Sequence, residues 1–133
     1  RQRQMCIRDS HYTGFLSAEK LAKKLTEVNA VVIPSSIENA PNSLAEGEIV
    51  GTPTIATYVG GNMDMLEHNK DGFLYCYNEP NMLAEYLSQI FESDDLANCL
   101  SEHARATARK RHDPDTLEKT ILGIYDSLIL KNK

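Results

Sequence analysis

The fold of this chain is decided by residues 30–53, which read AVVIPSSIENAPNSLAEGEIVGTP. An apolar, β-branched run at 30–33 ends at Pro34. A helix predicted from about Asn42 ends at Gly51, before a second apolar run at 54–58. The order is strand, loop, helix, strand, and a crossover of about twenty residues suits a right-handed β-α-β unit. Ligands of such parallel sheets bind beyond the carboxyl ends of the strands, where residues 34–42 lie.

Two acidic residues flank the start of the predicted helix: Glu38 in the preceding loop and Glu46 on the first turns. A helix start exposes unpaired N–H groups and a positive dipole end, so the backbone of Asn42, Ser43 and Leu44 suits an anionic diphosphate. Carboxylates accept hydrogen bonds from hydroxyl groups. Two acids beside an anion site therefore suggest a nucleotide sugar, in which ribose and sugar hydroxyls flank a diphosphate.

Further motifs follow this pair in a fixed order. The motifs are Pro34-Ser35, Glu38 and Glu46 with seven residues between them, Gly51-Thr52-Pro53, Val59-Gly60-Gly61 and Asp71-Gly72-Phe73-Leu74. Together they resemble the donor-binding motifs of the retaining glycosyltransferases of group 1, also called family 4, which have the GT-B fold. The wording ENAPNSL at 38–44 resembles a sub-pattern common among bacterial surface-polysaccharide transferases. The resemblance covers roughly residues 11–130.

This resemblance implies an α/β fold, in which a Rossmann-like parallel sheet flanked by helices forms part of the C-terminal lobe of a GT-B enzyme. It implies a retaining glycosyltransferase that moves a sugar from a nucleotide-diphosphate donor to a glycan or lipid-linked acceptor, in bacterial surface-polysaccharide synthesis. Members of the family work without a bound metal or other cofactor. The implied location is the cytoplasm, with peripheral attachment to the inner membrane left open.

The resemblance also implies roles for individual residues. The acid at Glu38 is expected to contact the donor sugar and to stabilise the positive charge that develops at its anomeric carbon, which makes it the catalytic residue. The acid at Glu46 is expected to hold the ribose hydroxyls. The full set expected at the donor is Glu38, Asn39, Asn42, Ser43, Leu44 and Glu46, with loop contacts from Gly14, Gly60 and Gly61.

Each of these positions also has a purely structural interpretation. A loop glutamate such as Glu38 is usually solvated. Ser43 and Glu46 have the spacing of a capping box, in which the glutamate folds back on the helix start. Asn42 or Ser43 would then only cap the helix. The glycine pair 60–61 would end a strand, rather than let a loop approach the ligand closely.

One departure from the family pattern concerns Gly47-Glu48, where relatives usually have Ala-Met. Glycine inside a helix costs roughly 1 kcal/mol relative to alanine. Glu48 lies four residues after Leu44, on the helix face that is expected to be buried. The sequence identifies no partner for this carboxylate, so we expect it to reach the edge of the helix or to weaken the segment.

Apolar spacing predicts the remaining elements. They are a strand at 11–15, a helix at 18–28, a helical turn at 62–68, a strand at 73–77, helices at 80–92 and 94–111, and a last helix ending near 130. The last helix carries Tyr125, Leu128 and Ile129 on its apolar face, and we expect some of these side chains to be exposed. Asp64 is expected to have a structural role.

Composition excludes several classes of protein. The net charge of -5 argues against a general nucleic-acid binder. The three cysteines and four histidines lack metal-ligand spacing, which predicts no metal site and a reduced, intracellular protein. No apolar run approaches the roughly 20 residues of a membrane span.

The first ten residues, RQRQMCIRDS, lack periodicity and look like translated sequencing-adapter sequence. We therefore interpret 1–10 as non-native and 11–133 as a partial nucleotide-sugar-binding domain whose gene continues upstream. The N-terminal acceptor lobe, and the Arg and Lys with which the family neutralises the diphosphate, would then lie upstream. The 133 residues alone are expected not to catalyse transfer. The competing hypothesis is a stand-alone nucleotide-binding module, which a stop codon just before Tyr12 would support.

Overall fold

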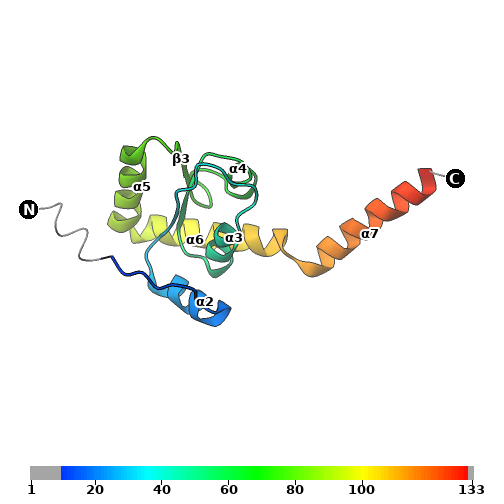
Figure 1. Cartoon of the computed structure of the whole chain (residues 1–133), viewed down its shortest axis with the longest axis horizontal. Coiled ribbons are helices and arrows are strands. Elements are labelled where there is room, and N and C mark those ends of the chain that lie inside the picture. The colour runs from blue at the N-terminus through cyan, green and yellow to red at the C-terminus, as the bar shows by residue number, and fades with distance from the viewer. Residues whose placement is uncertain (1–9, 132–133) are drawn as a thin grey trace, which may run out of the picture.

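The computed structural model describes residues 10–131, which form a three-stranded parallel sheet with helices packed around it (Figure 1). In chain order the elements are α2 (Ala18–Glu27), β1 (Val31–Ile33), α3 (Asn42–Val50), β2 (Thr54–Thr57), α4 (Asn62–Met65), β3 (Phe73–Tyr75), α5 (Pro80–Glu92), α6 (Asp94–Arg111) and α7 (Pro114–Lys131). The strand order is β1-β2-β3, with Val31 opposite Thr54 and Ile55 opposite Phe73. The predicted α/β architecture is confirmed.

Two apolar clusters, one on each face of the sheet, form the core. The cluster under α3 and α4 contains Ile33, Leu44, Ala56, Leu66 and Leu74. The cluster under α5 and α6 contains Ile55, Phe73, Tyr75, Ile90 and Leu100. The neighbours Ile55 and Ala56 belong to different clusters because successive strand residues point to opposite faces. Burial on both faces explains why the strands read as continuous apolar runs.

Helix α3 ends where the sequence predicts, at Gly51. This residue has a φ of 82°, and its N–H donates to the carbonyls of Gly47 and Glu48 at 2.9 and 3.0 Å. Such left-handed caps satisfy the last carbonyls of a helix and favour glycine. Gly47 lies against the strands, since a Cβ added there would be 3.0 Å from Oγ1 of Thr54. The glycine therefore lets α3 pack closely on the sheet.

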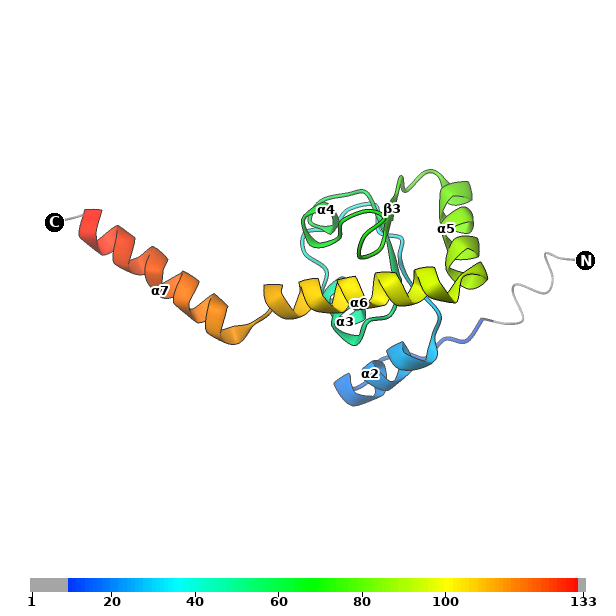
Figure 2. The same cartoon turned by 180° about the vertical axis from the view of Figure 1, so that it is seen from behind.

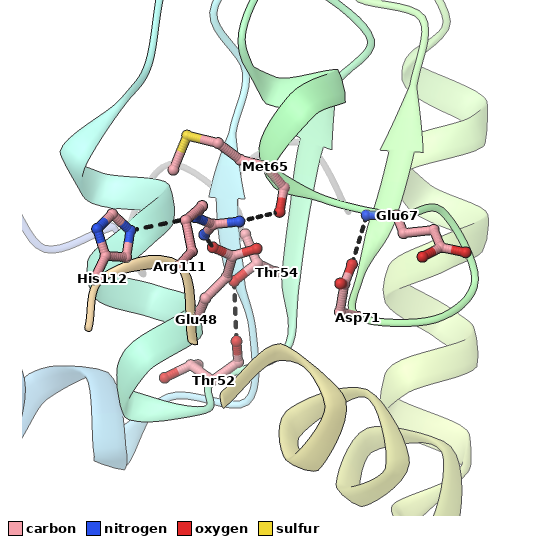
Figure 3. A network of polar contacts seen from close by, with 8 residues as sticks. All are labelled: Glu48, Thr52, Thr54, Met65, Glu67, Asp71, Arg111 and His112. Carbon is pink, nitrogen blue, oxygen red and sulfur yellow. Dashed lines mark hydrogen bonds and ion pairs between the residues drawn. The ribbon is translucent and has the colours of Figure 1, made fainter. Parts of the chain in front are cut away.

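Glu48 is fully buried, so the expectation that its side chain would reach the helix edge is wrong. Its carboxylate forms an ion pair with Arg111 at the end of α6 (Figure 3). Arg111 also donates through Nη1 to the carbonyl of Met65 at 2.6 Å and through Nε to Nε2 of His112 at 3.3 Å. Arg111 lies 63 residues after Glu48 in the sequence. The arginine therefore ties the end of α6 to α3.

The Glu48 carboxyl makes stability depend on pH. Burial raises its pKa from 4.5 to about 7, although Arg111 opposes the shift. Between pH 4.5 and about 7 the Glu48 carboxyl keeps its proton in the folded chain but has lost it in the unfolded chain. The stability that Glu48 contributes through this proton is therefore full at low pH and is lost as the pH rises through 7. From pH 5.5 to 7.5 we expect the wild type to lose about 2 kcal/mol of unfolding free energy relative to Glu48→Gln.

Urea denaturation of both chains at the two pH values measures this difference. The comparison with glutamine cancels most of the titration of other groups, because the two chains differ only at position 48. If the wild type instead became more stable relative to Glu48→Gln as the pH rose, the raised pKa of the Glu48 carboxyl would be contradicted.

The segment before α2 differs from the prediction. The strand expected at 11–15 does not form, and residues 10–17 lie outside helices and strands. Gly14 has a φ of 65°, which interrupts an extended chain, and Tyr12 and Phe15 are exposed. Of the apolar side chains in residues 10–17, only that of Leu16 is partly buried, so little apolar contact would hold the segment beside β1.

Helix α7 extends away from the sheet and the other helices in both views (Figures 1 and 2). Its exposed large apolar side chains are Leu117, Ile121, Leu122, Ile124, Tyr125, Leu128, Ile129 and Leu130. The expected exposure of Tyr125, Leu128 and Ile129 is confirmed. Across residues 10–131, no helix combines the length and the apolar character that crossing a bilayer requires.

Candidate functional site

The loop that carries Glu38 follows β1 and leads into α3, so it lies at the carboxyl edge of the sheet. Glu38 is half-buried, and its Oε1 accepts a hydrogen bond of 2.6 Å from the hydroxyl of Ser35. The carbonyl of Ser35 in turn accepts a 2.6 Å bond from Oγ1 of Thr57, the last residue of β2. The loop of residues 34–41, the acid loop, is therefore attached to the end of the central strand β2. Within this loop, Ser35 orients the carboxylate of Glu38.

The glycine pair after β2 packs against the same loop. A Cβ added to Gly60 would lie 1.8 Å from the carbonyl oxygen of Glu38, and one added to Gly61 would lie 1.5 Å from that of Asn39. Gly60 also has a φ of 49°. No side chain fits at such distances, so these glycines allow two backbones to touch. Gly14, in contrast, has no atom of residues 10–131 within 4 Å of an added Cβ.

The start of α3 lacks the predicted side-chain cap. Pro41 is the N-cap residue and gives no side-chain hydrogen bond. Asn42 and Ser43 therefore do not cap the helix, and Ser43 and Glu46 form no capping box. The physical reason is register: the helix begins at Asn42, so Ser43 lies inside the first turn instead of at the N-cap, and Glu46 lies too far along the helix to fold back on its start.

This start leaves two backbone donors free. The N–H of Leu44 donates to the carbonyl of Pro41 at 3.1 Å. Within residues 10–131, the N–H groups of Asn42 and Ser43 have no hydrogen-bond partner, and both residues are exposed. Of the three backbone donors expected to face a diphosphate, Leu44 is thus already engaged. The free N–H groups and the dipole make this tip suitable for an anion.

Glu46 lies on the exposed side of α3, four residues after Asn42 and three after Ser43. This spacing places its side chain on the same helix face as the side chains of Asn42 and Ser43, whose backbone N–H groups are free. It also stands at the rim of an apolar pocket of about 210 Å³ between α2 and α3. The lining residues are Ala18, Leu21, Ala22, Leu25, Glu46, Ile49 and Val50, and Glu38 is not among them.

The structure thus brings Glu38, Asn39, Gly60 and Gly61 together, and places Glu46 beside the tip of α3. Ser35, from the Pro34-Ser35 motif, holds the acid loop together with two residues that sequence reasoning did not single out, Thr57 and Asn62. The available signal was Thr57, a hydroxyl side chain at the end of a strand that is followed directly by the Val59-Gly60-Gly61 motif. Among residues 10–131, the structure contains no cluster of three or more His, Cys, Asp or Glu side chains suited to a metal ion.

The family model described as "Glycosyl transferases group 1" matches residues 6–107. The chain is 28% identical over 115 residues to the 2-deoxystreptamine N-acetyl-D-glucosaminyltransferase of Niallia circulans. That alignment spans 86% of this chain but 30% of the enzyme. The chain therefore corresponds in length to about a third of such a relative.

Two solved structures resemble this chain. HepE from Anabaena in complex with UDP-glucose superposes with a TM-score of 0.72 at 25% identity, over 79% of this chain and 29% of HepE. The C-terminal domain of LpcC from Francisella tularensis, described as a glycosyl transferase group 1 family protein, gives a TM-score of 0.69 at 16% identity, over 76% and 52% of the two chains. The sheet and its helices match the C-terminal lobe of GT-B glycosyltransferases, as the sequence predicts.

Proposed function

The chain belongs to the family of group 1 glycosyltransferases, and from this premise we propose that it forms the donor-binding part of a retaining enzyme whose substrate is a nucleoside-diphosphate sugar. One observation carries the proposal: two free backbone donors, at Asn42 and Ser43, stand at a helix start between two acids. Glu38 precedes the donors in the chain, and Glu46 shares their helix face. A diphosphate at the helix tip would have its two ends near these carboxylates.

In this proposal each group has a separate task. The free N–H groups of Asn42 and Ser43 hold the diphosphate, which is the leaving group, and the helix dipole stabilises its negative charge. Glu46 accepts hydrogen bonds from the ribose hydroxyls. Glu38 binds hydroxyls of the transferred sugar, and its charge stabilises the oxocarbenium-like transition state. The helix start, rather than a metal ion, neutralises the departing diphosphate.

A uridine nucleotide is the first donor to test, because HepE was solved with UDP and with UDP-glucose. The acceptor that we propose is a glycan or a lipid-linked glycan of the bacterial surface. This part of the proposal is supported by the ENAPNSL wording of residues 38–44. It concerns the parent enzyme, of which this chain would supply the donor lobe.

Titration calorimetry of the 133-residue chain with UDP tests the proposal. Replacing Glu46 by glutamine should weaken UDP binding by about tenfold, since hydrogen bonds to charged groups contribute about 1.5 to 3 kcal/mol. Its free energy of unfolding should stay within about 0.5 kcal/mol of the wild type, because the exposed side chain caps nothing.

Glu102→Gln is a matched control, since Glu102 is an exposed glutamate on α6. This variant should bind UDP as the wild type does. A chain that bound no UDP, or a Glu46→Gln variant that lost stability instead of affinity, would overturn the proposed function.

A further inference from the structure

Two buried polar residues on and after β2 lie beneath the acid loop. Thr57 ends the strand and Asn62 begins α4, and both are completely buried. Asn62 Nδ2 donates to the carbonyl of Thr57 at 3.0 Å and to its Oγ1 at 3.3 Å. Thr57 Oγ1 donates to the carbonyl of Ser35 at 2.6 Å. The four groups form a continuous chain of hydrogen bonds that ends at the acid loop.

The direction of these hydrogen bonds follows from which of the groups carry a proton. A hydroxyl has one proton, and Thr57 gives it to the carbonyl of Ser35, so its lone pairs accept from the amide of Asn62. The amide cannot turn over without placing Oδ1 against the Thr57 carbonyl, where two acceptors would face each other. The orientation of the Asn62 amide is therefore fixed, and so is the direction from donor to acceptor along the hydrogen bonds.

This orientation has a cost. Oδ1 of Asn62 is buried and has no hydrogen-bond partner within residues 10–131. An unsatisfied buried acceptor costs about 1 to 3 kcal/mol. An apolar side chain would avoid this cost but would lose both donations to Thr57. The two donations to Thr57 therefore come at the cost of an unsatisfied acceptor, and what they add is a fixed orientation of the Thr57 hydroxyl.

The same two residues hold both sides of the acid loop. Through Thr57 they fix the carbonyl of Ser35, whose hydroxyl binds Oε1 of Glu38. Through Asn62, which bonds back to Thr57 across the turn, they fix Gly60 and Gly61 against the carbonyls of Glu38 and Asn39.

We propose that Thr57 and Asn62 are positioning residues, which set the carboxylate of Glu38 for the sugar half of the donor. This inference rests on the proposed function. It leaves Oε2 of Glu38, which has no hydrogen-bond partner in the described part of the chain, directed to the ligand. In the proposed function the diphosphate and the nucleoside are held by α3, to which the network makes no hydrogen bond. Loss of the network should therefore affect recognition of the sugar and leave recognition of the nucleotide unchanged.

The test compares the dissociation constants of UDP-glucose and UDP. In Thr57→Val, which keeps the shape and removes the hydroxyl, the ratio of the UDP-glucose constant to the UDP constant should rise about tenfold. The UDP constant itself should stay within about twofold. Thr57→Ser restores the hydroxyl and should restore the ratio. Ser35→Ala, which removes the hydroxyl that binds Glu38 directly, should raise the ratio even if Thr57→Val fails to fold.

Three results would overturn the assignment. Equal weakening of both ligands would mean a structural role only, and an unchanged ratio in Thr57→Val and Ser35→Ala would mean that Glu38 needs no positioning. A wild-type chain that binds neither ligand would refute the proposed function, and this inference with it. If the wild type binds both ligands and the variants have the same ratio of dissociation constants as the wild type, the positioning role is refuted but the proposed function is not.

Discussion

Replacing Arg111 by methionine is expected to lower the free energy of unfolding by about 3 to 5 kcal/mol at pH 7.5. Glu48 is completely buried, and the guanidinium of Arg111 is its ion-pair partner in the described part of the chain. Methionine keeps much of the apolar contact and removes the charge. The carboxylate would then be a buried charge without compensation, which proteins tolerate poorly.

The pH dependence and a second substitution separate this cause from lost packing. At pH 5.5 the loss should shrink by at least half, because Glu48 has a raised pKa and can be neutral there. Glu48→Met combined with Arg111→Met should recover most of the stability, since no charge remains buried. Urea denaturation followed by circular dichroism gives all of these values.

Arg109→Met is the matched control, because Arg109 is an exposed arginine in the same last turn of α6. It should change stability by no more than about 0.5 kcal/mol. If Arg109→Met and Arg111→Met destabilised the chain equally, the ion pair would not be what holds α6 against α3.

The second large effect is expected at the glycine pair. Gly61→Ala should lower the free energy of unfolding by about 3 kcal/mol or more, because the new Cβ would lie 1.5 Å from the carbonyl oxygen of Asn39. The atom in the way belongs to the backbone and cannot rotate aside as a side chain can. The loop that carries Glu38 must therefore shift, and UDP-glucose binding should be lost as well.

Gly123→Ala provides the control for this substitution. A Cβ at Gly123 meets no atom of residues 10–131 within 4 Å, and the residue lies inside α7, where alanine is the better helix former. This variant should be as stable as the wild type or slightly more stable. A Gly61→Ala chain with wild-type stability and UDP-glucose affinity would show that the two loops are not packed as described.

These predictions depend on contacts that the sequence alone did not reveal, although much of the fold was predictable from it. The bounds of α3, from Asn42 to Val50, follow from a proline-rich loop on one side and Gly51 on the other. The short apolar runs correctly predicted β1, β2 and β3. Such signals are local, since each depends on the conformation of a few consecutive residues.

The capping box was the main local error. The spacing of Ser43 and Glu46 fits the motif, but the helix begins two residues earlier than the motif requires, with Pro41 rather than Ser43 as its N-cap. A shift of this size changes every capping role. The donor-binding roles of Glu38, Asn39, Asn42, Ser43, Leu44 and Glu46 stay predictions, which the binding experiments above test.

By itself, the sequence determined the order of strands and helices from α2 onward, the family, and the place of the two acids around a helix start. Those features are encoded by neighbouring residues and by fixed spacings. Only the tertiary structure decided which groups meet: Arg111 with Glu48, the glycine pair with the acid loop, and Thr57 with Ser35. The reason is physical, because these contacts join segments up to 63 residues apart and arise only when both faces of the sheet are covered.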